Sequence, residues 1–195
     1  MTGTLRANIF IALTLLIVGC SSPKQADVKY QPIFDFGNLE SYGLYGREDE
    51  FNDWQPLSHA IRNSIELAIE QEMEAQQFSF KPADSADVVI TYYIVKQNQR
   101  TFRAYNQGVN YCSYCLTNTK SGKKEERLRI VPGSLIIDAV KPKNRRSIWR
   151  AAYPLRIKEK DNSAQINEKV KEAVSIIIKQ FAEAANKTDS LSNRA

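Results

Sequence analysis

Two cysteines three positions apart, Cys112 and Cys115, are the first place in this sequence where chemistry could occur. A C-x-x-C spacing serves zinc sites, redox centres and disulfides. Zinc needs about four ligands, and the main further candidates are the single histidine, His59, and carboxylates. A thioredoxin-type motif opens a helix after a strand, whereas Tyr111 and Tyr114 flank these cysteines in a polar stretch. Neither zinc nor redox catalysis suits that setting, and we predict no metal and no cofactor.

Arg150 and Asp138 are the second candidate, as part of a ligand or partner surface together with Tyr111 and Tyr114. Trp149 and Arg150 are adjacent on a predicted strand, so the pattern places Trp149 in the core and Arg150 toward solvent. Asp138 belongs to the neighbouring strand, from which it could pair with Arg150. The alternative is that Arg150 lines a ligand groove and binds a carboxylate or phosphate.

Few other residues or motifs in the 195-residue sequence suggest catalysis. The chain has one histidine and contains no G-x-S-x-G, no phosphate-binding glycine loop and no H-E-x-x-H. Hydrophobic residues make up 43% and charged residues 25%, which is typical of a folded soluble domain. The net charge is +5, without a basic stripe. The sequence therefore argues against an enzyme and against nucleic-acid binding.

Basic residues gather in two segments, 120–124 and 141–146. Solvated loop charge accounts for both segments. The alternative is contact with anionic lipid headgroups, because a membrane surface favours each nearby cation by about 1 kcal/mol.

Apolar residues at helical spacing predict two helices that would carry the core. The first covers about 57–76, with Pro56 in its first turn. The second has its apolar stripe over 166–181, and Asn162 with Gln165 forms a capping box at its start.

Extended segments predict about four strands, at 28–45, 88–95, 135–140 and 148–155. The run 88–95 is continuously apolar or aromatic, which indicates burial on both faces. Between the second and third strands lies a long polar insertion, 97–129, in which we expect short strands.

These elements predict an α+β fold, a two-layer sandwich with two amphipathic helices on one face of a roughly four-stranded, mostly antiparallel sheet. The last two strands should form a hairpin around 141–146. The initial strand–helix–strand unit should be a right-handed crossover.

The N-terminal residues 1–19 have the pattern of a signal peptide. Arg6 supplies the positive region, and the apolar run 9–18 is too short to span a membrane, which takes about 20 residues. The run ends Ile17-Val18-Gly19-Cys20, which resembles a bacterial lipobox. An uncleaved anchor or an ordinary secretory signal is the alternative.

The lipobox resemblance implies that Cys20 becomes the first mature residue and carries diacylglycerol and a further acyl chain such as palmitate. Two or more chains give stable anchoring. Ser21 in place of Asp implies the outer membrane of a Gram-negative bacterium, with the protein facing the periplasm. In that oxidising compartment the two remaining cysteines, Cys112 and Cys115, form an even pair, so we predict a disulfide between them.

Several segments of the mature chain together resemble the domain-of-unknown-function 4136 family of Gram-negative envelope lipoproteins. The most specific is Gly133-Ser134-Leu135-Ile136-Ile137-Asp138, followed after a turn by Ile148-Trp149-Arg150. Ser85 to Tyr92 and the closing helix also match. The chain departs from the family at Ala151, where Gly is expected. The resemblance implies a shared fold, and the family has no known activity.

The predicted organisation is a signal peptide over 1–19, a lipidated tether over 20–27, one domain over 28–186 and a flexible tail over 187–195. The expected function is a non-catalytic binding or envelope-assembly module, attached to the membrane by its lipid and recognising an unidentified envelope protein or ligand. The alternative is a small-ligand-binding protein or enzyme that uses the sheet face and the tyrosine-rich insertion as a pocket.

Overall fold

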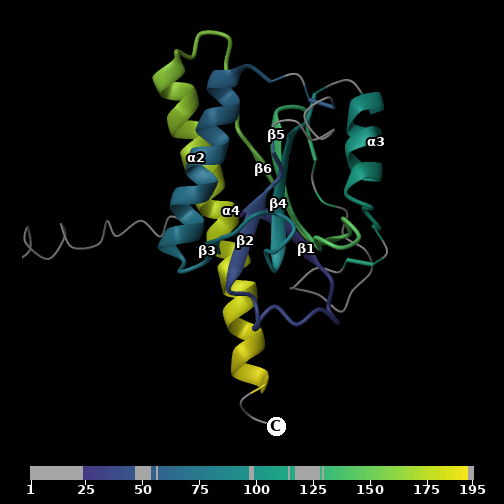
Figure 1. Ribbon diagram of the computed structural model, residues 1–195. Helices are drawn as coiled ribbons and strands as arrows, with labels where there is room; N and C mark the ends of the chain where they lie inside the picture. The colour runs from purple at the N-terminus through teal and green to yellow at the C-terminus, as the bar shows by residue number, and fades with distance from the viewer. Residues whose placement is uncertain are drawn as a thin grey trace, which may run out of the picture.

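The computed structural model describes residues 24–46, 54, 55, 57–96, 99–113, 115, 116, 128 and 130–192. Within these residues, three helices and six strands form one α+β unit (Figure 1). The strands are β1 Asp27–Tyr30, β2 Ser41–Leu44, β3 Ser79–Phe80, β4 Val88–Ile94, β5 Ser134–Val140 and β6 Ser147–Pro154. The helices are α2 His59–Ala75, α3 Gln99–Gly108 and α4 Ser163–Ser192. Within the described residues, no helix is long and apolar enough to cross a membrane.

The six strands form a single mixed sheet in the order β1-β6-β5-β4-β2-β3. The predicted hairpin is confirmed, because β5 and β6 pair antiparallel. Strands β2 and β4 pair parallel across α2, as a crossover requires. The prediction of four strands missed β3 at one edge, and it merged β1 and β2, which lie at separate places in the sheet.

Local signals set the starts of the two long helices. The side chain of Ser58 caps α2 by accepting a hydrogen bond from the Ile61 amide, so the helix begins after Ser58. At α4 the predicted capping box is present, because Asn162 and Gln165 exchange hydrogen bonds between side chain and backbone amide at 3.0 Å.

Helices cover both faces of the sheet, which corrects the expected two-layer arrangement. Helices α2 and α4 lie together on one face, and α3 lies on the other (Figure 1). The larger core cluster joins α2 and α4 to the first face, whereas a second cluster joins Tyr105 and Val109 of the α3 segment to the second face. The burial of β4 on both faces, predicted from its apolar run, is confirmed.

Two boundaries also differ from the prediction. The insertion contains helix α3 where short strands were expected, because Phe102, Tyr105 and Val109 recur at helical spacing and bury one side of it. Helix α4 continues to Ser192, into the expected tail, since no proline or glycine interrupts it after Phe181.

The end of the expected tether belongs to the folded domain. Lys24 pairs with Glu172 of α4, and the Ala26 amide donates to the Gln180 side chain at 2.7 Å. Ala26 is itself buried. The packed domain therefore includes Lys24 and Ala26 from the expected tether.

Phe181 of α4 is the centre of the aromatic core on the first face. It is fully buried, and its ring lies 5.2 Å from that of Trp149 and 5.6 Å from that of Phe78, between centroids. This side chain therefore ties α4 both to β6 and to the segment after α2.

We predict that Phe181→Ala lowers the free energy of unfolding by about 3–5 kcal/mol, because the truncation leaves a cavity among close-packed rings. Urea denaturation of the full chain measures the loss. Lys179→Ala, on an exposed position of the same helix, should change it by less than about 0.5 kcal/mol. A loss below about 1 kcal/mol at Phe181 would mean that α4 is peripheral.

Candidate functional site

A row of polar residues crosses the second face of the sheet beneath α3. Thr91 of β4 lies opposite Asp138 of β5, and Asp138 lies opposite Arg150 of β6. Lys29 of β1 continues the row opposite Arg150. All four residues are buried, in a sheet whose other inward positions are almost entirely apolar.

The carboxylate of Asp138 is the centre of this row and accepts three hydrogen bonds. Arg150 Nε donates to Oδ1 at 2.8 Å and Ser147 Oγ donates to Oδ1 at 2.6 Å. Tyr105 of α3 donates to Oδ2 at 2.7 Å, and its hydroxyl also lies 2.9 Å from Thr91 Oγ1. A buried charge is tolerated only when it is paired and hydrogen-bonded in this way.

A β-bulge in β6 brings Ser147 into this cluster. Trp149 pairs with Ala139 and Ser147 with Val140, so Ile148 has no partner in the register. Ile148 and Trp149 consequently both face the first core, whereas Ser147 turns to the second face. The bulge thus re-aims one side chain toward the carboxylate, as bulges commonly do.

Arg150 is held by groups from α3 and from the segment that follows it. Its Nη1 donates to Asn106 Oδ1 at 2.8 Å, and the Tyr111 ring stacks on the guanidinium, with 3.7 Å between Cζ and the ring centroid. Both side-chain partners come from the insertion. Nη2 is buried and makes no hydrogen bond with a described residue.

Burial sets the titration of the groups around the pair. It raises the pKa of Tyr105 well above the ordinary tyrosine value, and the negative charge of Asp138 adds to this. Burial also raises the pKa of Tyr111. For Arg150, burial alone would lower the pKa, but the neighbouring Asp138 charge outweighs it and the pKa is raised. Both phenols stay protonated and Arg150 stays charged at neutral pH.

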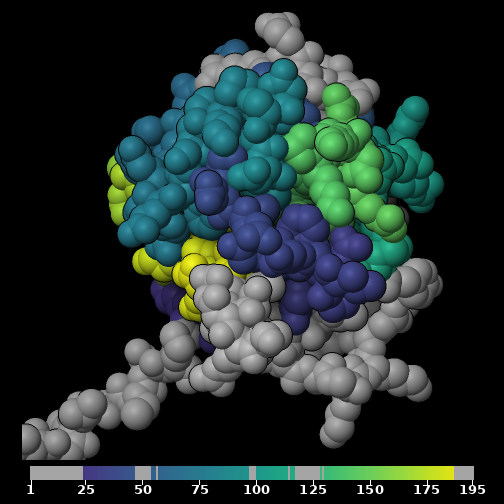
Figure 2. Space-filling model, turned by 60° about the horizontal axis from the view of Figure 1, so that its bottom comes forward, coloured from purple at the N-terminus to yellow at the C-terminus, as the bar shows by residue number. Residues whose placement is uncertain are grey.

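An open groove of about 570 Å³ lies above this cluster, and we call it the α3 groove. It is lined by Arg103, Asn106, Gln107, Asn110, Tyr111, Asn144 and Arg146. The first four residues lie on α3 or just after it, and Asn144 and Arg146 come from the β5–β6 turn. Figure 2 shows this turn, in green, at the surface beside the purple N-terminal segment. Asn106 and Tyr111 both contact Arg150, so the buried guanidinium lies directly beneath two groove residues.

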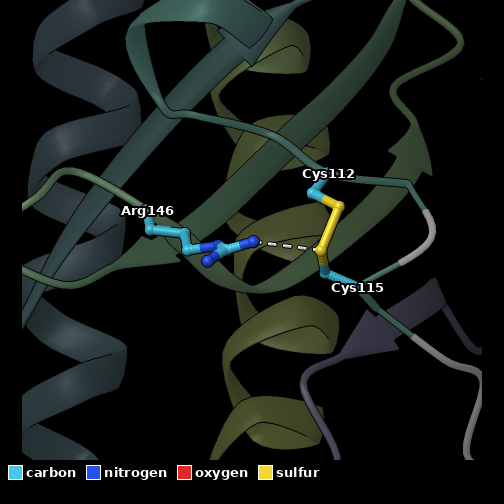
Figure 3. The surroundings of a disulfide bond; sticks show 3 residues. All are labelled: Cys112, Cys115 and Arg146. Carbon is cyan, nitrogen blue, oxygen red and sulfur yellow. Dashed lines mark hydrogen bonds between the residues drawn. A yellow bond between two sulfur atoms is a disulfide. The ribbon is translucent and has the colours of Figure 1, made fainter.

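The predicted disulfide between Cys112 and Cys115 is present at the end of the groove (Figure 3). Nη2 of Arg146 donates a hydrogen bond to the Cys115 sulfur at 3.0 Å, and this hydrogen bond links the insertion to the β5–β6 turn. The two cysteines are only three positions apart, and closing so small a loop stabilises a fold by about 2 kcal/mol at most. Among the described residues, no three Cys, His, Asp or Glu side chains gather closely enough to hold a metal ion.

The structure brings together three of the predicted surface residues and corrects their setting. Asp138 and Arg150 pair as the sequence suggested, and Tyr111 stacks on the pair. The placement of Arg150 toward solvent is wrong: both side chains are 0% exposed, because α3 covers the face that was expected to be open. Tyr114 and Cys20 lie outside the described residues.

Sequence reasoning missed Tyr105, Asn106 and Ser147, which complete the cluster. The signal for Tyr105 was available, since Phe102, Tyr105 and Val109 follow helical spacing. Ser147 had no such signal, because its orientation depends on the bulge.

The site consists of a buried ion pair on a mixed sheet, beneath a helix and an open polar groove. This arrangement by itself does not identify an activity. Residues 26–181 match the family model described as Domain of unknown function (DUF4136). The chain belongs to this family, so the family membership predicted from the sequence is confirmed. A crystal structure of a DUF4136 family protein from Bacteroides thetaiotaomicron is similar, with a TM-score of 0.50 and 16% identity over 82% of this chain and 98% of that chain. At this identity the likeness shows the fold alone. No curated protein matches the chain.

We predict that the Asp138–Arg150 pair shows strong energetic coupling. Asp138→Asn and Arg150→Met should each cost about 3–5 kcal/mol, because each leaves the other charge buried and unpaired. The double variant should cost less than the sum by at least about 2 kcal/mol. Urea denaturation of the four proteins gives this coupling energy.

The exposed pair Glu168 and Lys171, 3.7 Å apart, is the control for this cycle. Its coupling between Glu168→Gln and Lys171→Met should stay below about 1 kcal/mol. Additive losses at Asp138 and Arg150 would contradict a mutually dependent pair.

Proposed function

We propose that this protein is a non-catalytic binding module, held by a lipid on Cys20 at the periplasmic face of the outer membrane of a Gram-negative bacterium, and that it binds through the α3 groove. The observation that carries the binding role is the groove itself, an open polar hollow above the buried Asp138–Arg150 ion pair.

The state of Asp138 supports a non-catalytic role. Its three donors occupy both carboxylate oxygens, and the side chain is closed to solvent. A general acid or base must reach a substrate proton directly or through one water. Asp138 and Arg150 are arranged to hold the groove floor in shape, and the groove walls carry amides, arginines and one tyrosine.

The lipid anchor is supported by the sequence before the domain. The lipobox-like Ile17-Val18-Gly19-Cys20 ends four residues before Lys24, which pairs with Glu172 of α4. A lipidated Cys20 would therefore be joined to the fold by a very short segment.

We predict that a fatty-acid analogue labels the wild-type protein and not Cys20→Ser, because the thioether can form only on that cysteine. The unlabelled variant should leave the membrane fraction, since acyl chains supply the anchoring free energy. Cys112→Ser, which removes a different cysteine, should keep the label. Equal labelling of Cys20→Ser and wild type would defeat the anchor.

We predict that a photo-reactive p-benzoylphenylalanine at Gln107, an exposed residue of the groove, forms an adduct when intact cells are irradiated. Mass spectrometry of the purified protein detects small and large adducts alike. The same residue placed at Lys179, exposed on α4 across the sheet, is the control and should not form the adduct found at Gln107. Equal yields at both positions, or none at Gln107, would reject the α3 groove as the binding surface.

A further inference from the structure

The α3 groove has a positive charge that no groove residue balances. Its lining includes Arg103 and Arg146 and no acidic side chain. Within the described part of the chain, neither arginine forms an ion pair. Such a groove attracts anions, and arginine binds carboxylate or phosphate through two parallel hydrogen bonds.

The buried row beneath the groove adds to the positive charge. Asp138 neutralises Arg150, but Lys29 stands opposite Arg150 and has no carboxylate partner among the described residues. The row therefore holds two basic side chains, Arg150 and Lys29, and one acidic side chain, Asp138. A buried charge is less screened by salt than a surface charge.

Three asparagine side chains line the groove, and each uses one end of its amide group in a hydrogen bond within the protein. Asn106 Oδ1 accepts from Arg150, and Asn110 Nδ2 donates to the Asn144 carbonyl at 2.6 Å. Asn144 Oδ1 accepts from the Arg146 amide at 3.1 Å. The other ends, two NH₂ groups and one carbonyl oxygen, make no hydrogen bond with a described residue. Fixed donors and an acceptor beside each other suit the hydroxyl groups of a sugar, which both donate and accept.

The remaining lining and the size fit the same ligand. Tyr111 supplies an aromatic side chain beside the amides. The volume of about 570 Å³ lies within the range of small-molecule sites, roughly 300–1,000 Å³. Most such sites are lined by apolar side chains, whereas this one is polar, so an apolar ligand would leave its amides and guanidinium groups unpaired.

We propose that the α3 groove binds an acidic sugar, a carbohydrate bearing a carboxylate or a phosphate. This rests on the proposed binding role of the groove. Arg103 and Arg146 hold the oxyanion, and the free ends of Asn106, Asn110 and Asn144 bind the hydroxyls. Arg146 is itself positioned by its contact with the Cys115 sulfur.

The test is isothermal titration calorimetry of the detergent-purified full chain with four probes: glucose 6-phosphate, glucuronate, glucose and inorganic phosphate. At least one of the two acidic sugars should bind, and raising the salt should weaken it. Glucose and inorganic phosphate should each bind at least about tenfold more weakly, because each lacks half of the contacts. Binding of glucuronate identifies a carboxylate source, and binding of glucose 6-phosphate a phosphate source.

Charge variants locate the site. Arg103→Gln and Arg146→Gln should each weaken the acidic sugar by about tenfold or more, the loss of a charge-assisted hydrogen bond. Lys179→Gln removes the same charge across the sheet and should leave the affinity unchanged. Arg103 is exposed and makes no hydrogen bond with a described residue, so its variant should fold with wild-type stability.

Several results would overturn the proposal: no binding of either acidic sugar, glucose as tight as the acidic sugars, phosphate as tight as the acidic sugars, or unchanged affinity in both arginine variants. Failure here is distinct from failure of the binding role. An adduct at Gln107 in cells without acidic-sugar binding would keep the groove as a binding surface and reject this ligand.

Discussion

The ion pair between Asp138 and Arg150 is the constraint on which this fold depends. Two charges at the middle of a sheet cost several kcal/mol each to remove from water, and their attraction repays this only with close geometry and further hydrogen bonds. The hairpin of β5 and β6 sets them opposite each other. Ser147 of the same hairpin donates to the carboxylate, and the remaining partners come from outside the hairpin, so the pair requires a cover for the second sheet face.

Helix α3 provides that cover, and the features around it follow from this requirement. Tyr105 donates a hydrogen bond to the carboxylate, and Asn106 accepts one from Nη1 of the guanidinium. The Ser147 amide donates to the Val109 carbonyl at 2.8 Å, which joins the end of the helical segment to the bulged strand. Gly108 lets the Trp54 ring lie against the helix, since a Cβ there would stand 2.0 Å from that ring. The polar groove is the outer surface of the same cover.

The sequence predicted the first face of the sheet well and the second face poorly. Long amphipathic stripes and capping residues located α2, α4 and the hairpin, because their apolar spacing is regular over many residues.

Helix α3 is short and polar outside its buried side, so the composition of the insertion concealed it. The wrong placement of Arg150 followed from missing α3. If helices cover only one face of a sheet, alternate residues of each strand face water, and Arg150 was assigned to that open face. The continuous apolar run of β4 already contradicted that assumption. The bulge that turns Ser147 depends on tertiary packing, and no local pattern marks it.

Under the proposed lipid anchor, the contact of Lys24 and Ala26 with α4 bears on how the domain would sit at a bilayer. Lys24 pairs with Glu172, and the Ala26 amide donates to the Gln180 side chain. Both partners belong to α4, on the face of the sheet opposite α3. The four residue steps from a lipidated Cys20 to Lys24 could extend by no more than about 14 Å, at about 3.5 Å per residue. So short a segment would keep the α4 side of the domain close to the lipid headgroups and limit rotation of the domain. The opposite side, with the α3 groove, would then be turned outward to molecules diffusing through the periplasm.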